Sequence, residues 1–285
     1  MFTVFSSRHP DRHRRRWLSS LLLSATFVGG TLLATPQIGW AGDLLDLIFQ
    51  AIQVVQLSNL SDRQEGELGR QINQQLVGGE IRLYRNQQIN QYVNGIGQRL
   101  ARVSSRPDIT YTFQVVEDDS INAFATMGGF VYVHTGLIAE ADNEAQLASV
   151  IAHEIGHIAG RHAVEQMQQM AIAQGVMTAA GLDRNAAVNI GVELALRRPN
   201  SRQHEFEADE LGVATLQKAG YAPIAAADLL RKLVNQTGST PAFLSTHPAA
   251  SDRIEAIEQS IEPGRARVGS GLNGQAYRRR IRVLL

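Results

Sequence analysis

The chain has 285 residues, of which 44% are hydrophobic and 19% charged, and this is enough to build a sizeable folded core. Its 27 basic and 27 acidic side chains cancel, but basic residues are concentrated in the first 41 positions. The remainder is mildly acidic, which argues against nucleic acid as the main partner. The absence of cysteine excludes disulfides, thiolate metal ligands and a cysteine nucleophile.

Residues 1–41 have the pattern of an export signal. An arginine-rich stretch ending at Arg16 is followed by an apolar run that reaches Ala34, and Pro36 and small residues precede Ala41. We therefore expect a signal peptide that is cleaved after Ala41, with an uncleaved N-terminal membrane anchor as the alternative. Both interpretations predict an exported protein, periplasmic or secreted.

Hydrophobic periodicity predicts a mainly helical chain after this segment. An amphipathic linker helix is expected within 42–61, and helices follow at 62–77 and 86–103. Alternating apolar residues then predict strands at 111–116 and 130–133. Further helices are expected at 143–169, 186–197, 203–219, 223–236 and 249–261.

The last residues, 263–285, are rich in arginine and glycine and contain no acidic side chain. We expect a flexible tail here, and peripheral contact with an anionic membrane surface is an alternative role. The apolar stretch 167–177 is expected to form a helix that covers the site or a dimer surface, with a substrate-sensing lid as a further alternative.

The chemistry of the chain is concentrated in the segment His153-Glu154-Ile155-Gly156-His157. Two histidines four residues apart lie one turn apart on the same face of a helix, so both imidazoles can reach one metal ion. Glu154 projects to a neighbouring angle, where it can take a proton from water activated by zinc. A histidine pair that serves only packing is disfavoured, because each buried polar group would then need another partner.

A catalytic zinc needs a third protein ligand. In the segment 201–209, helical spacing places Glu205, Ala208 and Asp209 on one face, so that Glu205 can bind the metal while Asp209 orients a ligand histidine. Spacing by itself does not choose between Glu205 and His204. The other candidates downstream of the motif are His162, Glu207 and His247.

Four more segments accompany the motif in a fixed order, at 121–125, 128–137, 201–209 and 245–248. Together with Arg253, they resemble the zinc peptidase family that contains the CAAX prenyl proteases and HtpX, and most closely its soluble periplasmic quality-control branch. The resemblance covers about residues 62–261. It implies an α+β, mainly helical, zincin-like fold of the gluzincin type, with a small antiparallel sheet and an active-site HExxH helix. The metallopeptidase domain is expected at residues 62–262.

The resemblance also implies the composition of the site. His153, His157 and Glu205 are expected to hold one zinc ion, with Glu154 as the general base and Asp209 behind a zinc histidine. Strand 130–133 is expected to be an edge strand that pairs with an extended substrate backbone, with core packing as the alternative role.

Two later residues are implied to complete the site. His247 is similar to the loop histidine that this branch can place close to the metal, and Arg253 to a residue that supports the developing oxyanion. For His247 the alternative is a role at a helix N-terminus, because Pro248 suits the first helical position. We interpret the remaining candidates His134, His162 and His204 as structural or surface histidines.

These observations predict a zinc-dependent metalloendopeptidase that cleaves unfolded or misassembled envelope proteins in protein quality control. The alternative is a chaperone-like client-binding protein with a latent zinc site blocked by His247. A purely structural zinc site is disfavoured, because such sites usually have four protein ligands, commonly including cysteine.

Overall fold

The computed structural model describes residues 54–178, 181–197 and 199–285. The chain divides into two units, Met1–Leu44 and Leu45–Leu285, and the fold described below belongs to the second. The predicted signal peptide and most of the predicted linker helix lie outside the described residues. Within the described ranges no helix is long and apolar enough to cross a membrane.

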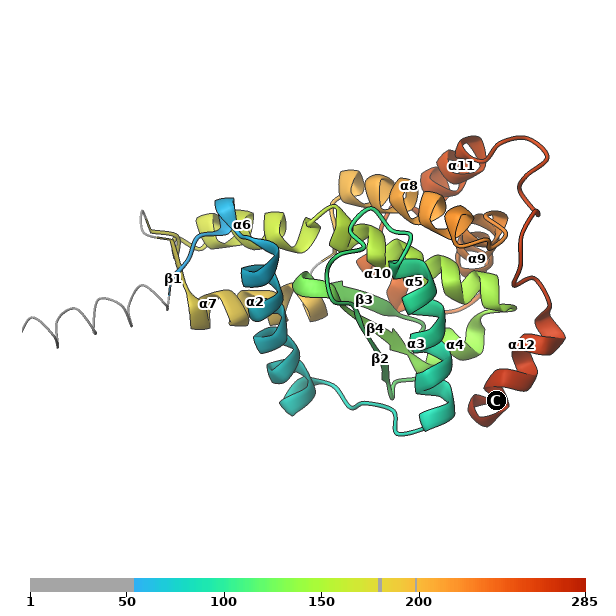
Figure 1. Ribbon diagram of the computed structural model, residues 1–285, viewed down its shortest axis with the longest axis horizontal. Coiled ribbons are helices and arrows are strands. Elements are labelled where there is room, and N and C mark those ends of the chain that lie inside the picture. Colours follow the sequence, from blue (N-terminus) through green and yellow to red (C-terminus); the bar gives the residue numbers. More distant parts are fainter. Residues whose placement is uncertain (1–53, 179–180, 198) are drawn as a thin grey trace, which may run out of the picture. The chain divides into compact units, whose positions relative to one another are not determined.

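A three-stranded sheet is flanked by helices (Figure 1). Its order is β2 (Thr112–Val116), β4 (Phe130–His134) and β3 (Ala123–Thr126), with β2 and β4 parallel and β3 and β4 antiparallel. The sheet is therefore mixed, not antiparallel as expected, because the β3–β4 hairpin turns back and inserts β4 beside β2 in the same direction. The hairpin turn uses Gly128 and Gly129, whose φ angles of 76° and 93° favour glycine.

The same strand order corrects the predicted edge strand. Residues 130–133 lie in β4, the central strand, so their backbone is already paired on both sides. β3 and β2 border the sheet instead, and the sequence pattern did not predict β3, because two of its four residues are alanine, which is uncommon in strands.

Helices make up most of the described chain, which confirms the mainly helical α+β fold. Side-chain caps begin several of them, such as the reciprocal hydrogen bonds between Ser61 and Gln64 at the first helix. The longer helices are α2 (Asp62–Gln75), α3 (Gln87–Ala101), α5 (Glu144–Ala159), α6 (His162–Ala173), α7 (Arg184–Arg197), α8 (Arg202–Lys218), α9 (Ile224–Val234) and α11 (Ala250–Ser260), and the shorter ones include α4 (Thr135–Glu140) and α10 (Ala242–Thr246).

The predicted helix 143–169 is divided in two. α5 ends at Ala159, Arg161 adopts a left-handed conformation with φ of 57°, and α6 starts at His162. Gly160 permits this turn, because a Cβ atom there would lie 2.4 Å from the His162 ring. The break brings the first residue of α6 back toward the end of α5.

Both ends of the described chain differ from expectation. The part of the predicted linker helix that the structure describes is not α-helical: β1 (Val54–Val55) pairs with β5 (Leu182–Asp183), because Val55 is β-branched and buries its side chain there.

The predicted flexible tail contains α12 (Gly274–Ile281), whose Tyr277 is buried and donates a hydrogen bond to the Ile138 carbonyl oxygen at 2.6 Å. The apolar face of α12 thus anchors the arginine-rich segment.

Two apolar clusters make up the core. The first gathers buried residues of α3, α5 and α9 with those of β2 and β4, and the second gathers residues of α2, α6 and α7. α6, α7 and α2 lie close together in Figure 1, while α8 runs along α5. The stretch 167–177 is only partly helical, and its Met167 is fully buried in the second cluster.

Candidate active site

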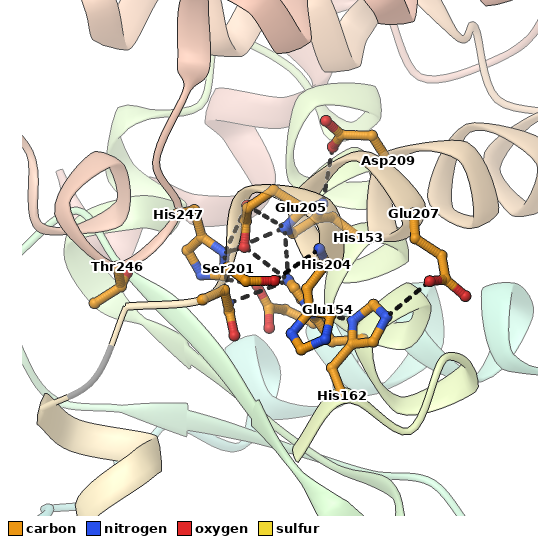
Figure 2. A network of polar contacts seen from close by, with 12 residues as sticks. His153, Glu154, His162, Ser201, His204, Glu205, Glu207, Asp209, Thr246 and His247 are labelled. Carbon is orange, nitrogen blue, oxygen red and sulfur yellow. Dashed lines mark hydrogen bonds and ion pairs between the residues drawn. The ribbon is translucent and has the colours of Figure 1, made fainter. Parts of the chain in front are cut away.

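Four buried side chains converge on one point of the fold, and Figure 2 labels three of them, His153, Glu205 and His247. His153 and His157 come from α5, Glu205 from the first turn of α8, and His247 follows α10 directly. The Nε2 atom of His153 is 3.0 Å from Nε2 of His157 and 3.4 Å from a carboxylate oxygen of Glu205. The Nδ1 atom of His247 is 3.2 Å from Nε2 of His153 and 3.1 Å from the other Glu205 oxygen.

The separations and the chemistry of these donors fit zinc. Zinc bonds of about 2.0–2.1 Å in a tetrahedron place neighbouring donor atoms about 3.3 Å apart. The distances here lie between 3.0 and 3.4 Å. Three imidazoles and one carboxylate are ordinary zinc ligands, and the set contains the three predicted ligands plus His247.

Small residues allow the two ligand-bearing helices to approach each other. A Cβ atom on Gly156 would lie 2.5 Å from the Ala208 carbonyl oxygen, and one on Gly212 would lie 3.1 Å from the His153 backbone. The close contact of α5 and α8 therefore brings Glu205 within reach of both motif histidines. His204 points elsewhere, toward Glu165 at 3.1 Å, so the structure favours Glu205 over His204 as the third ligand.

Glu154 is buried next to the four donors. It is 1% exposed, and its Oε1 atom makes no hydrogen bond with any residue in the described ranges. The Nε2 atom of His247 lies 3.5 Å from this oxygen. Burial raises the pKa of Glu154, which makes the carboxylate a better proton acceptor. A buried carboxylate oxygen without a partner is a candidate for a catalytic role.

Residues 87–261 match peptidase family M48. The chain belongs to this family. M48 peptidases are zinc-dependent, in agreement with the group of donors described above.

Among curated relatives, the beta-barrel assembly-enhancing protease of Escherichia coli (strain K12) is 33% identical over 213 residues, which are 69% of this chain and 44% of that protein. The mitochondrial metalloendopeptidase OMA1 of Schizosaccharomyces pombe is 33% identical over 174 residues, 59% of this chain and 52% of that protein. OMA1 of Arabidopsis thaliana is 35% identical over 164 residues, 56% of this chain and 33% of that protein. The chain thus spans about half or less of the length of these relatives.

Polar side chains behind the HExxH motif hold the metal ligands in place. Asp209 accepts a hydrogen bond from Nδ1 of His153 at 2.9 Å, which is the position that the resemblance implies. Arg253 donates from Nε and Nη2 to Asp209 at 2.6 and 2.8 Å, and its Nη1 lies 2.6 Å from Glu205. Arg253 also donates to the His247 carbonyl oxygen at 3.2 Å.

The position of Arg253 suits a residue that holds the ligands in place. Its side chain is 1% exposed, and its guanidinium lies behind the ligands with its donors directed at Asp209, Glu205 and the His247 backbone. Arg253 lines a pocket beside His153 and Asp209 and not the cleft next to Glu154, and its expected support of an oxyanion stays a prediction. The alternative role of His247 was a role at a helix N-terminus, with Pro248 in the first helical position. Pro248 does not occupy that position, because it precedes Ala249, the N-cap of α11.

The protonation of the ligands follows from their surroundings. Burial and the Arg253 charge lower the pKa of His153, but hydrogen bonds with Asp209 and Glu205 outweigh them and raise it to about 9. Burial lowers the pKa of His157 well below its ordinary value. Burial also raises the pKa of Glu205, but the surrounding histidines hold it far below its usual range. Zinc binds the deprotonated form of its ligands, so we expect metal affinity to fall at low pH.

Two residues near the metal centre were missed by the sequence analysis. His162, interpreted there as structural or surface, is buried with its Nδ1 atom 2.8 Å from Nδ1 of His157. Asn200 places its amide nitrogen 3.4 Å from Nε2 of His157 and 3.3 Å from Nδ1 of His247. The signal for His162 is the glycine at position 160, which permits a turn; nothing in the local pattern singles out Asn200.

A cleft that is partly open to solvent adjoins the donors. Glu154, His157 and His247 line one wall, and residues 124–126 of the edge strand β3 line another. The Ala123 carbonyl oxygen lies 3.4 Å from Nε2 of His247. Most of the other lining side chains are apolar, among them Ile72, Met127, Ile158, Val164, Leu194 and Ala195.

Proposed function

We propose that the protein is an exported zinc metalloendopeptidase that hydrolyses unfolded or misassembled envelope proteins. The observation that carries the proposal is the buried Glu154 carboxylate next to a zinc-compatible donor set at the wall of a cleft. Membership of family M48 and the similarity to a protein named beta-barrel assembly-enhancing protease support it. A peptidase domain at residues 62–262 and a signal peptide or membrane anchor at residues 1–41, leading to a periplasmic or secreted location, belong to this proposal.

In this proposal His153, His157 and Glu205 hold the metal, and Asp209 and Arg253 fix their orientation. Bound zinc would act as a Lewis acid on a peptide carbonyl and make water a nucleophile at neutral pH. Glu154 takes the proton from the attacking water and passes it to the leaving amine. Its burial and raised pKa suit it for holding that proton between the two steps.

The cleft suits an extended protein substrate of variable sequence. β3 is one of the two border strands of the sheet, and its residues line the cleft that also contains Glu154. A substrate strand that pairs with such an edge is bound mainly through its backbone, which tolerates many sequences. The apolar lining accommodates side chains that folded proteins bury, as expected for an enzyme that acts on unfolded clients.

The test is cleavage of unfolded casein by the purified mature protein, with and without a chelator, beside Glu154→Gln. We expect cleavage that requires zinc and falls at least about 100-fold in the variant, the usual contribution of a general base. Zinc content is measured in both proteins, so that loss of metal is not mistaken for loss of the base. Equal cleavage by a zinc-loaded Glu154→Gln protein would refute the mechanism.

One observation favours the second candidate, a client-binding protein whose zinc site is latent. His247 is part of the donor set, where a catalytic zinc site leaves a position open. Its other ring nitrogen lies within 3.5 Å of both Glu154 and the Ala123 carbonyl oxygen of β3. One side chain therefore faces the metal position, the base and the edge strand together.

His247→Ala distinguishes the two candidates. If His247 gates a peptidase, the variant cleaves casein faster than wild type and still binds zinc through the other three ligands. If the variant and the wild type both bind zinc and casein but neither cleaves, the peptidase proposal fails and the latent binding protein remains. An unchanged cleavage rate in His247→Ala would contradict the gating role alone.

A further inference from the structure

The two zinc histidines of α5 are held from behind by different partners. Their Nε2 atoms face each other across the donor group at 3.0 Å, so both Nδ1 atoms point away from it. A histidine that binds metal through one ring nitrogen usually donates its other N–H to an acceptor, which fixes the tautomer and the orientation of the ring. At His153 that acceptor is the Asp209 carboxylate. At His157 the atom in the equivalent place is Nδ1 of His162.

When a metal is bound, only one placement of the ring hydrogens is consistent with the contact between His157 and His162. The two Nδ1 atoms are 2.8 Å apart, so one must carry the hydrogen and the other must accept it. If Nε2 of His157 is bound to metal, the hydrogen of that ring is on Nδ1. Nδ1 of His162 is then the acceptor, and the hydrogen of His162 lies on Nε2, which faces Glu207 at 3.4 Å (Figure 2).

The structure also holds the His162 ring firmly. The ring stacks on His204 with centroids 4.3 Å apart and an angle of 8° between planes, and His204 is itself fixed by Glu165 at 3.1 Å. The backbone turn at Gly160 and Arg161 leads directly into His162. A ring that is buried, stacked and placed by a tight turn keeps its acceptor in one position relative to His157.

We propose that His162 is a positioning residue of the metal site, the hydrogen-bond acceptor that orients His157. It is the counterpart of Asp209 at His153. The inference rests on the metal site of the proposed function and not on peptide hydrolysis. It also explains two histidines that the ligand pattern left without a role, since His204 supports His162.

The test compares zinc binding by four forms of the full chain: wild type, His162→Leu, His162→Asn and His134→Leu. Leucine removes the acceptor, whereas asparagine keeps an oxygen close to where Nδ1 stood. His134 is the matched control, because it is a buried histidine with a 2.8 Å hydrogen bond to Ser120 and lies outside the donor set. Zinc affinity is measured by competition with a chromophoric chelator, and the absorption of the cobalt-substituted protein reports the ligand geometry.

We expect His162→Leu to lower zinc affinity about 10–100-fold and to shift the cobalt spectrum, as loss of a ligand's supporting partner does. His162→Asn and His134→Leu are expected to stay within about threefold of wild type, since each leaves an acceptor behind His157. Thermal unfolding of the metal-free proteins shows whether His162→Leu and His134→Leu are destabilised alike, so that a general loss of fold is separated from a loss of metal affinity.

The inference is overturned if His162→Leu binds zinc as tightly as wild type, or if His162→Asn is as weak as His162→Leu. A wild-type chain that binds no zinc would overturn both the inference and the proposed function. A wild type that binds zinc without cleaving casein would refute only the proposed function, because the role of His162 is tested by zinc affinity and not by cleavage.

Discussion

At the scale of single residues, each ligand depends on a partner that lies behind it. Asp209 holds His153, His162 contacts His157, and Arg253 joins Asp209 to Glu205. These partners are nearly as buried as the ligands themselves. The site is therefore sensitive to substitutions that touch neither metal nor substrate.

Replacement of Arg253 by lysine keeps the positive charge but removes the planar fork that reaches Asp209 and Glu205 together. We expect R253K to lose zinc affinity and about 3–5 kcal/mol of unfolding free energy, because a buried carboxylate is left without its partner. Chemical denaturation and chelator competition measure the two effects. A variant that keeps both stability and zinc affinity but loses only kcat would support the oxyanion role instead.

The choice of third ligand can be tested with a matched pair. Glu205→Ala removes an oxygen donor from the centre of the group, so the variant should lose stoichiometric zinc at micromolar metal. His204→Phe keeps a flat ring against His162 and should retain one zinc per chain. Metal analysis after gel filtration gives the answer. The opposite pattern would assign the ligand to His204.

At the scale of elements, the site is formed by the close packing of α5 against α8. Gly156 is the point of contact, since a Cβ atom there would lie 2.5 Å from the Ala208 carbonyl oxygen. The distance between the helices sets the distance between the histidine pair and Glu205, so packing and metal binding are coupled.

Gly156→Ala should therefore push the helices apart. We expect a loss of about 1–3 kcal/mol in unfolding free energy, as in overpacked cores, together with weaker zinc binding. The control is Gly95→Ala on α3, where an added Cβ meets nothing within 4 Å and should stabilise the helix by about 0.8–1 kcal/mol. If Gly156→Ala is as stable as wild type and binds zinc equally well, α5 and α8 are not as tightly joined as described.

The C-terminal helix α12 provides a second test at this scale. Tyr277 is 1% exposed and donates to the Ile138 carbonyl oxygen, so Tyr277→Ala should lower the unfolding free energy by about 3–5 kcal/mol. Arg279→Ala, on the exposed face of the same helix, should change it by less than about 0.5 kcal/mol. Urea unfolding measures both, and equal stability of the two variants would show that the segment is a tail after all.

Sequence reasoning succeeded where the information is local. The spacing of His153 and His157 on one helix, and the placement of Glu205 and Asp209 on another, follow from helical periodicity together with the resemblance, and the family membership is confirmed. The position of Arg253 was not predictable, because it depends on how α11 packs against α8.

Three other features escaped prediction for the same kind of reason. The division of the helix at 143–169 depends on the single left-handed residue Arg161, which periodicity does not reveal. The apolar residues of α12 are few and lie among arginines, so the sequence of this segment predicts a polar, exposed stretch. The position of Asn200 likewise follows from the hydrogen bond that its backbone N–H donates to the Thr246 carbonyl oxygen, far along the chain.

At the scale of the whole molecule, the cleft lies between two apolar clusters. Ile158 belongs to the first and Ile72, Phe124 and Met127 to the second, and all four line the cleft. The motif helix α5 packs in the first cluster, while α6 and α7 pack in the second.

We propose that His153, His157 and Glu205 hold the zinc ion and that His247 fills its fourth position while the site is at rest. X-ray absorption spectroscopy of the zinc-loaded protein tests it most directly. The account predicts one zinc per chain with four nitrogen or oxygen donors at about 2.0–2.1 Å, three of them imidazoles, and the loss of one imidazole in His247→Ala with zinc retained. Six oxygen donors, or fewer than two imidazoles in the wild type, would contradict it.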